Sequence, residues 1–352
     1  MSMPNNSSTS TSPVEACSRE TARRLPPGDH LLDLPCVGTV GSDRERGQMS
    51  TAKADADALY AAAMSLGVDE VRENFLKLPF AYPGGKGEQL KEILPHLPYG
   101  SGYGEAFGGS GAVLLNRERS KLEVFNDRYS GVTDFFRVVR DPALFPKFME
   151  RVNLTLHSRE EFIWCKRTWK DVENPVERAA RWYYMIRFAV NCKPNSTFGR
   201  SKNPVVRFAD RLHKSLPMFH PIHYRLYTVT IENLDWRICL QDFDRPGFVW
   251  YLDPTYLDSS PGTYQHELSV EDHRELVSRI SSMHGFVAVS SYDTPATNAV
   301  YDKAGVWDDK IIFGRQTTAL TQAFMDTNGL SSKETINDRS KVREVLWIRR
   351  AR

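Results

Sequence analysis

Residues 248–252, with the sequence Phe-Val-Trp-Tyr-Leu, are apolar at every position, and this run constrains the fold more than any other feature of the chain. A strand with one face in water alternates apolar and polar residues, whereas a strand covered on both faces does not. The run therefore predicts a central strand of a parallel sheet with helices on both sides. It ends in Asp253-Pro254-Thr255-Tyr256, so polar side chains follow the strand at its carboxyl end.

The segments around this strand alternate between strand and helix patterns. Apolar spacing predicts helices over residues 87–97 and 112–116 and from Ser269, where Asp272 completes a capping-box-like start. Strands are predicted over residues 103–107, 122–125, 286–289 and 342–348. Such alternation indicates an α/β fold with a doubly wound, mostly parallel sheet.

Two regions depart from this pattern. Residues 1–52 are poor in apolar residues, and seven of the first 13 are Ser or Thr, which predicts a disordered N-terminal tail. Residues 53–79 show helical spacing and are expected to form a helical N-terminal extension. Residues 141–225 are rich in Arg, Lys and aromatic residues and predict an inserted, mainly helical domain.

Charge is distributed unevenly along the chain. The net charge is only +2, yet residues 151–237 contain 16 Lys/Arg and 8 Asp/Glu, while the remaining residues contain 30 and 36. A basic segment in an otherwise acidic chain is typical of a polyanion-binding region. A solvated charged face would give the same counts, so charge alone leaves both interpretations open.

The five cysteines are odd in number, widely spaced and free of any CxxC pair. This pattern argues against a disulfide framework and a zinc cluster and favours a reducing cytoplasm, so we expect a cytoplasmic protein without a metal. No apolar run reaches the ~18 residues of a membrane span, and the N-terminus lacks the pattern of a secretory signal.

Two more strand ends carry residues suited to a nucleoside. The segment Glu105-Ala106-Phe107-Gly108-Gly109-Ser110-Gly111 has glycines that let a ligand approach the backbone closely. The absence of a following Gly-Lys-Ser/Thr argues against a phosphate-binding P-loop. Asn126-Asp127 lies about twenty residues further on, where a carboxylate can accept hydrogen bonds from ribose hydroxyls. Taken alone, Asp127 fits better as a loop residue that caps the next helix.

The segment Asp253-Pro254-Thr255-Tyr256 resembles the Asp-Pro-Pro-Tyr motif of amino-group methyltransferases. The amino nitrogen of adenine is a poor nucleophile because its lone pair is delocalised into the ring. The Asp253 carboxylate and the Pro254 carbonyl could accept its N–H bonds and free the lone pair for attack on a methyl group. Tyr256 offers a flat face on which a base flipped out of a duplex could stack.

The order of these motifs resembles that of the Dam-type (D12 class) N6-adenine-specific DNA methyltransferases. Tyr82-Pro83-Gly84-Gly85-Lys86 comes first, and the glycine motif, Asn126-Asp127, the basic insert and the Asp253 motif follow. Residues 231–236, 290–293 and 342–346 also agree with that family, and the likeness covers roughly residues 79–350. It implies a Rossmann-like catalytic domain over residues 80–140 and 226–352, with residues 141–225 as the target recognition domain.

The resemblance also implies a site. The methyl donor would be S-adenosyl-L-methionine, with no metal, and Lys86 could neutralise the carboxylate of the donor. The residues implied for donor binding are Tyr82, Lys86, Glu105, Phe107, Gly109, Asp127 and Asp253, and those implied for catalysis are Asp253, Pro254 and Tyr256. Duplex DNA with a flipped adenine would be the substrate, and we expect it to contact Arg187, Lys193, Arg200 and Lys202.

Ala106 and Thr255 depart from the family pattern, which usually has Pro at both positions. Loss of the proline at 255 would loosen the catalytic loop and free a backbone N–H. Two alternatives stay open. One is the same chemistry on the N4 atom of cytosine, and the other is an inactive methyltransferase fold kept as a DNA-binding module. Motif order and the flanking matches favour adenine over the first, and retention of Asp253, Tyr256, Lys86 and Asp127 argues against the second.

Overall fold

The computed structural model describes residues 75–200, 212, 215–259, 262, 264–302, 305–313 and 343–352. The tail predicted over residues 1–52 lies outside these residues, as does the predicted extension apart from residues 75–79. Lys202, expected at the DNA interface, also lies outside them.

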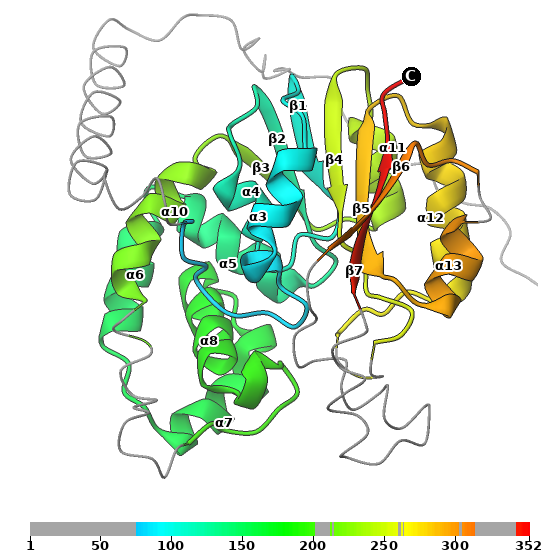
Figure 1. The fold of residues 1–352 in the computed structure, drawn as a ribbon. Helices are drawn as coiled ribbons and strands as arrows, with labels where there is room; N and C mark the ends of the chain where they lie inside the picture. The colour runs from blue at the N-terminus through cyan, green and yellow to red at the C-terminus, as the bar shows by residue number, and fades with distance from the viewer. Residues whose placement is uncertain are drawn as a thin grey trace, which may run out of the picture. The chain divides into compact units, whose positions relative to one another are not determined.

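The described strands form one sheet in the order β3-β2-β1-β4-β5-β7-β6 (Figure 1). Strands β1 to β5 pair in parallel, whereas β7 runs antiparallel to both β5 and β6. The doubly wound, mostly parallel α/β fold predicted from the sequence is confirmed. The strands are β1 (Gly102–Glu105), β2 (Leu122–Asn126), β3 (Val229–Glu232), β4 (Phe248–Leu252), β5 (Phe286–Tyr292), β6 (Asp309–Phe313) and β7 (Glu344–Arg349).

Helices cover both faces of the sheet. Alternate residues of the central strands belong to two apolar clusters, one on each face. Tyr103 and Tyr251 belong to the cluster on one face, and Trp250 belongs to the cluster on the other. The first cluster includes residues of α3 (Leu90–Ile93), α4 (Ala112–Asn116), α5 (Ser130–Arg140) and α10 (Phe219–Leu226). The second includes residues of α11 (Trp236–Phe243), α12 (Val270–Ser282) and α13 (Pro295–Tyr301).

The apolar run that dominates the sequence is β4, and all five of its residues are buried. Its large rings explain two glycines of the neighbouring strand. A Cβ atom on Gly102 would come within 2.2 Å of the Phe248 ring, and one on Gly104 within 2.5 Å of the Trp250 ring. Close packing of β4 against β1 therefore depends on glycine at both positions.

Several predicted elements match the structure closely. Helix α4 begins at Ala112, where the sequence predicts a helix to start, and the Ser269–Asp272 capping box at the start of α12 is present. The single helix predicted over residues 87–97 is wrong. That segment forms a 3-10 turn at Lys86–Glu88, the short helix α3 and a second 3-10 turn at Leu94–His96. Pro95 provides the reason, because it lacks the N–H that an uninterrupted helix requires.

The segment between β2 and β3 is mainly helical, as the sequence predicts for residues 141–225. It contains α6 (Phe145–Asn153), α7 (Arg159–Thr168), the 3-10 turn η3 (Trp169–Asp171), α8 (Pro175–Phe188), the 3-10 turns η4 (Val190–Cys192) and η5 (Leu216–Met218), and α10. Helix α8 packs on α5, where the Tyr183 and Phe135 rings stack with centroids 5.3 Å apart. These helices share the apolar cluster of the sheet, and their assignment to a separate recognition domain stays a prediction.

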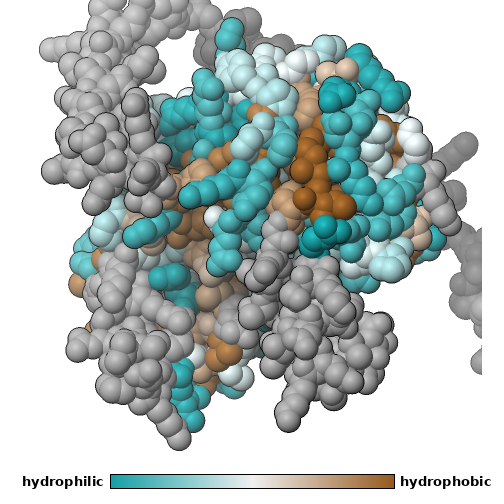
Figure 2. All heavy atoms as spheres, viewed as in Figure 1, coloured by the Kyte–Doolittle hydropathy of each residue, from teal (hydrophilic) through white to brown (hydrophobic). Residues whose placement is uncertain are grey.

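Hydrophilic residues cover much of the described surface in the space-filling view, and apolar residues appear in bands between them (Figure 2). Among the described residues, no helix is long and apolar enough to cross a membrane.

Candidate active site

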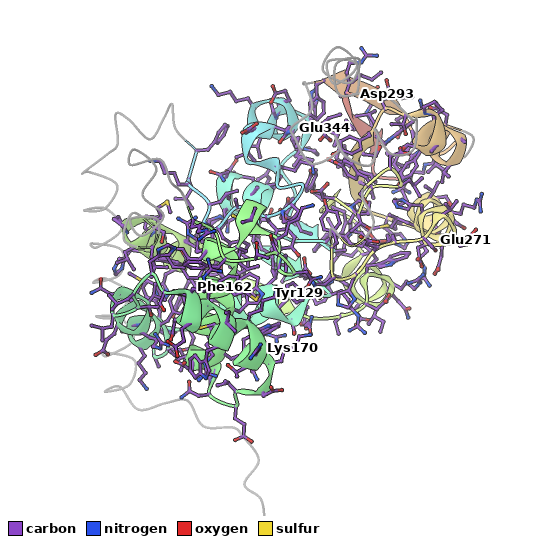
Figure 3. All side chains as sticks on the ribbon, turned by 90° about the horizontal axis from the view of Figure 1, so that it is seen from below. Tyr129, Phe162, Lys170, Glu271, Asp293 and Glu344 are labelled. Carbon is purple, nitrogen blue, oxygen red and sulfur yellow. The ribbon has the colours of Figure 1, made fainter. Side chains whose placement is uncertain are left out.

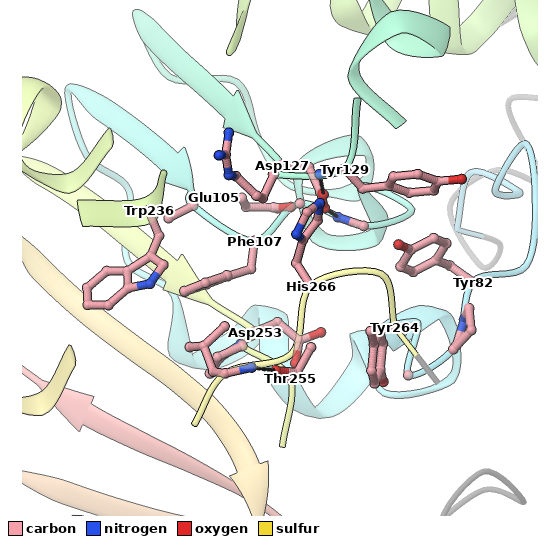
Figure 4. A pocket seen from close by; sticks show the side chains of 18 of the residues that line it. Tyr82, Glu105, Phe107, Asp127, Tyr129, Trp236, Asp253, Thr255, Tyr264 and His266 are labelled. Carbon is pink, nitrogen blue, oxygen red and sulfur yellow. Dashed lines mark hydrogen bonds between the residues drawn. The ribbon is translucent and has the colours of Figure 1, made fainter. Parts of the chain in front are cut away.

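The carboxyl ends of β1, β2 and β4 meet at one cavity of about 460 Å³ (Figure 4). β1 lies between β2 and β4, so the chain order of the strands reverses at this point of the sheet. Open α/β sheets bind ligands at such a switch point. All nine residues expected for donor binding and catalysis line the cavity, namely Tyr82, Lys86, Glu105, Phe107, Gly109, Asp127, Asp253, Pro254 and Tyr256.

Lys86 and Asp253 form a buried ion pair in this cavity, although 167 positions separate them in the sequence. The Lys86 Nζ atom lies 2.8 Å from each Asp253 carboxylate oxygen, but only Oδ2 has hydrogen-bond geometry. Nζ also donates to the Gly84 carbonyl at 2.6 Å. An ammonium has three N–H donors, so two are used and one remains for a ligand.

The two carboxylate oxygens of Asp253 differ in hydrogen bonding, although the Lys86 Nζ lies 2.8 Å from both. Its Oδ1 atom is buried without a hydrogen-bond donor among the described residues. Burial raises the pKa of Asp253, while the Lys86 charge and hydrogen bond lower it and so favour the ionised form. An ionised carboxylate with an unoccupied buried acceptor is suited to receive an N–H bond from a ligand.

The Tyr256 ring lines the cavity but its hydroxyl is engaged elsewhere. The hydroxyl donates to Oε2 of Glu344, the first residue of β7, at 2.9 Å. The ring meets Tyr292 edge to face with centroids 4.3 Å apart, and the Lys86 Nζ lies 4.9 Å from its centroid. These contacts fix the orientation of the ring that the sequence predicts to stack on a base.

Two further carboxyl groups border the cavity. Burial raises the pKa of Glu105 to about 8, although Tyr103 donates a 2.7 Å hydrogen bond to it. Burial also raises the pKa of Asp127 to about 6, and the backbone amides of Gly109 and Tyr129, each at 2.8 Å, oppose this rise. Asp127 thus holds the glycine turn in place and lines the cavity, but it does not cap α5, whose N-cap residue is Tyr129 and has no side-chain cap.

The first motif needs glycine at Gly84. This residue has φ +70°, and a Cβ atom there would lie 2.4 Å from the Tyr264 hydroxyl. Left-handed backbone is costly for other residues, and here the space is also filled. Gly84 therefore lets the Lys86 loop approach the segment around Tyr264.

Thr255 is held by two hydrogen bonds, although the absence of a proline at this position was expected to loosen the loop. Its Oγ1 atom accepts a hydrogen bond from the Leu268 amide at 2.8 Å. Its carbonyl lies 2.9 Å from Nε2 of the buried His273, whose Nδ1 lies 2.9 Å from the Tyr301 hydroxyl. The threonine hydroxyl supplies a contact that proline lacks, so the expectation of a looser loop finds no support in these contacts.

The structure adds residues that sequence reasoning did not select for the site. Tyr129 and Tyr264 lie with Tyr82 towards one end of the cavity, and Trp236 lies beside Phe107 towards the other (Figure 4). The Phe107 and Trp236 ring centroids are 6.1 Å apart. Trp236 lies within residues 231–236, which resemble the family in sequence, so the sequence could have indicated it as a site residue. Nothing in the sequence singles out Tyr129 or Tyr264.

The three expected DNA-contacting residues that the structure describes do not line this cavity. Arg187 is half-buried near the end of α8, Lys193 is half-buried after η4, and Arg200 is exposed. Several other cations of the basic segment pair with acids instead. Arg151 and Arg181 bind Glu177, each at 2.7 Å, and Arg178 binds Asp134 at 3.1 Å. Internal pairing therefore consumes part of the positive charge counted in the sequence.

Residues 82–313 match the model of the D12 class N6 adenine-specific DNA methyltransferases. The chain belongs to this family, as the order of its motifs indicated. It is similar to the DNA adenine methylases of Salmonella typhi and of Escherichia coli (strain K12). Each is 25% identical over 249 residues, which cover 63% of this chain and 83% of the relative. The activity that defines the family is methyl transfer to N6 of adenine in DNA.

Proposed function

We propose that the chain is an active, site-specific enzyme that moves a methyl group from S-adenosyl-L-methionine to N6 of adenine in duplex DNA. The observation that carries this proposal is the buried Lys86–Asp253 pair, whose Oδ1 atom lacks a donor at the cavity where three strand ends meet. An inactive DNA-binding module would have no need to keep a charged pair buried, because such pairs contribute little to stability.

The lining of the cavity fits the proposed donor. Asp127 offers a carboxylate to ribose hydroxyls, and Phe107 with Trp236 offers apolar faces to a purine. The remaining N–H of Lys86 and the carboxyl of Glu105 suit the carboxylate and ammonium of an amino acid. When bound, the donor supplies an electrophilic methyl group, and the residues of the chain orient the two reactants.

The proposed catalytic step depends on hydrogen bonding rather than on a covalent enzyme intermediate. The Oδ1 atom of Asp253 and the Pro254 carbonyl accept the two amino N–H bonds of a flipped adenine. This draws the nitrogen towards tetrahedral geometry and localises its lone pair for attack. Tyr256 supports the ring of the base, with stacking of the kind worth about 1–3 kcal/mol per base.

A direct experiment tests this function. The full chain is incubated with S-adenosyl-L-methionine carrying an isotope-labelled methyl group and with unmethylated bacterial DNA, and the digested nucleosides are separated by mass spectrometry. We expect labelled N6-methyladenine. Labelled N4-methylcytosine would overturn the choice of base, and DNA binding without any labelled base would favour the binding module.

We also propose that Arg128 and Lys170 bind DNA phosphates at the mouth of the cavity. Arg128 and His266 line the cavity, and Lys170 follows Trp169, whose ring centroid lies 5.8 Å from that of Tyr129 (Figure 3). After burial, the charges of Arg128 and Lys170 are the causes that lower the pKa of His266. Both cations are exposed, and neither forms an ion pair with a carboxylate of the described residues.

Replacing both Arg128 and Lys170 with Gln should weaken DNA binding and reduce its salt slope by about two, since each lost phosphate contact removes about one unit. Donor affinity should be unchanged. The matched control replaces Lys121 and Arg245 with Gln. These exposed cations precede β2 and β4 and therefore lie at the amino ends of the strands, whereas the cavity lies at the carboxyl ends. Binding is measured at several salt concentrations with a duplex that the wild-type chain methylates. Equal slopes for the two double variants would refute this placement.

A further inference from the structure

Glu344 is a second buried carboxyl group beside the proposed catalytic Asp253, and the mechanism above leaves it unused. It is 4% exposed and opens β7, where it pairs in register with Tyr292 of β5, next to Asp293 (Figure 3). Tyr256 joins the Asp253 motif to Glu344, because its hydroxyl donates a 2.9 Å hydrogen bond to Oε2. Burying a carboxyl group is costly, so its position in the site calls for a role.

The proposed reaction releases a proton from the amino group of adenine, and this proton must leave the cavity. When the lone pair of the amino nitrogen attacks the methyl carbon, a C–N bond forms and the C–S bond of the sulfonium breaks. The sulfur becomes a neutral thioether, and the nitrogen carries the positive charge until it loses one proton. Asp253 is the nearest acceptor, and its ion pair with Lys86 favours its ionised form although burial raises its pKa. Asp253 must therefore release the proton before the next turnover.

We propose that Glu344 is the final acceptor of this proton and that the Tyr256 hydroxyl relays it, an inference that rests on the proposed function. The amino proton moves to Asp253, the Asp253 O–H then donates to the Tyr256 oxygen, and the phenol passes its own proton to Oε2 of Glu344. Asp253 and Tyr256 return to their starting forms, while Glu344 ends neutral. Glu344 returns its proton to solvent after the product leaves.

Two observations support the relay. The Tyr256 hydroxyl lowers the pKa of both Asp253 and Glu344, although it can donate to only one of them at a time, so it lies within reach of both. Burial raises the pKa of Glu344, which makes its carboxylate a stronger base near neutral pH. The ionisable groups that face Glu344 are Lys86 of η1, Tyr251 of β4, Asp253 and Tyr256 after β4, Tyr264, and Tyr292 of β5.

The test separates proton acceptance from simple positioning of the ring. Glu344→Gln keeps an oxygen that can accept the Tyr256 hydroxyl but removes the base. Tyr256→Phe keeps the ring but removes the relay. We expect each to slow single-turnover methyl transfer at least tenfold, and the double variant to be no slower than either single variant, because residues of one relay act as a unit. Tyr256→Trp serves as a second variant without the hydroxyl.

The pH dependence gives a readout that a structural role would not move. In the wild type, the single-turnover rate should fall as pH drops and Glu344 and Asp253 become protonated, and in Glu344→Gln only the part of this limb that comes from Asp253 should remain. Infrared titration of the protein without donor should show one carboxyl C=O band fewer in that variant. Wild-type rates and an unchanged acid limb in Glu344→Gln would overturn the relay. A wild-type chain that methylates no DNA would instead overturn the proposed function.

Discussion

Replacing Asp253 with Ala is expected to reduce single-turnover methyl transfer by about 10²–10³-fold, the loss seen when one preorganised group of an oxyanion-hole type is removed. The physical reason is that the amino group of adenine loses the charged one of its two acceptors, so its lone pair stays delocalised. The rate is measured with saturating donor and a duplex that the wild type methylates. Turnover close to that of the wild type would remove Asp253 from the reaction.

A control variant separates this chemical loss from damage to the fold. Asp253→Ala leaves Lys86 buried without its partner, whereas Asp253→Asn keeps the volume and one oxygen for its hydrogen bond. Both variants should bind duplex DNA nearly as the wild type does, since the phosphate contacts proposed for Arg128 and Lys170 do not involve Asp253. Asp253→Asn should unfold at a higher temperature than Asp253→Ala and still transfer methyl groups slowly.

Replacing Lys86 with Met should have the second largest effect. Without the ammonium, burial remains as the main influence on Asp253 and raises its pKa further. The protonated carboxyl is a poor acceptor, so methyl transfer should be lost at neutral pH and recover in part as pH rises. Breaking a buried pair by removing one partner should also lower the free energy of unfolding by about 3 kcal/mol.

The pH dependence of stability in Lys86→Met should oppose that of activity. A carboxyl whose pKa is raised in the folded state binds its proton more tightly there than in the unfolded state. The free energy of unfolding therefore falls as pH rises above the pKa of the unfolded chain. Denaturant titrations between pH 5 and 9 measure this, and the double variant with Asp253→Asn should recover stability without activity. Stability that rises with pH in Lys86→Met would contradict the buried pair.

The sequence predicted the sheet and most of the cavity because both leave local signals. The uniformly apolar run of β4 requires burial on both faces, and polar residues at successive strand ends converge at one edge of a parallel sheet. The glycine motif and the Asp253 motif could therefore be assigned to one site from the residue pattern alone. Residues 1–74 and Lys202 lie outside the described residues, so the predictions about them remain untested.

The sequence could not predict how the side chains of the site pair with one another. The bond between Lys86 and Asp253, and that between Tyr256 and Glu344, join residues 167 and 88 positions apart, and no periodicity reports such contacts. The hydrogen bonds of Thr255 and His273 could not be predicted for the same reason, because each depends on a partner in another element. The charge count also overestimated the number of basic residues available to bind DNA, since Arg151, Arg178 and Arg181 form ion pairs within the insert or with α5.

The position of Glu344 has a consequence for biosynthesis. It belongs to β7, which inserts between β5 and β6 after every other described strand has been made. The chain emerges from the ribosome amino end first, so the cavity walls from β1, β2 and β4 exist before the carboxylate that holds Tyr256. A nascent chain would therefore form a donor-binding pocket early and acquire its full hydrogen-bonded site only when β7 is synthesised.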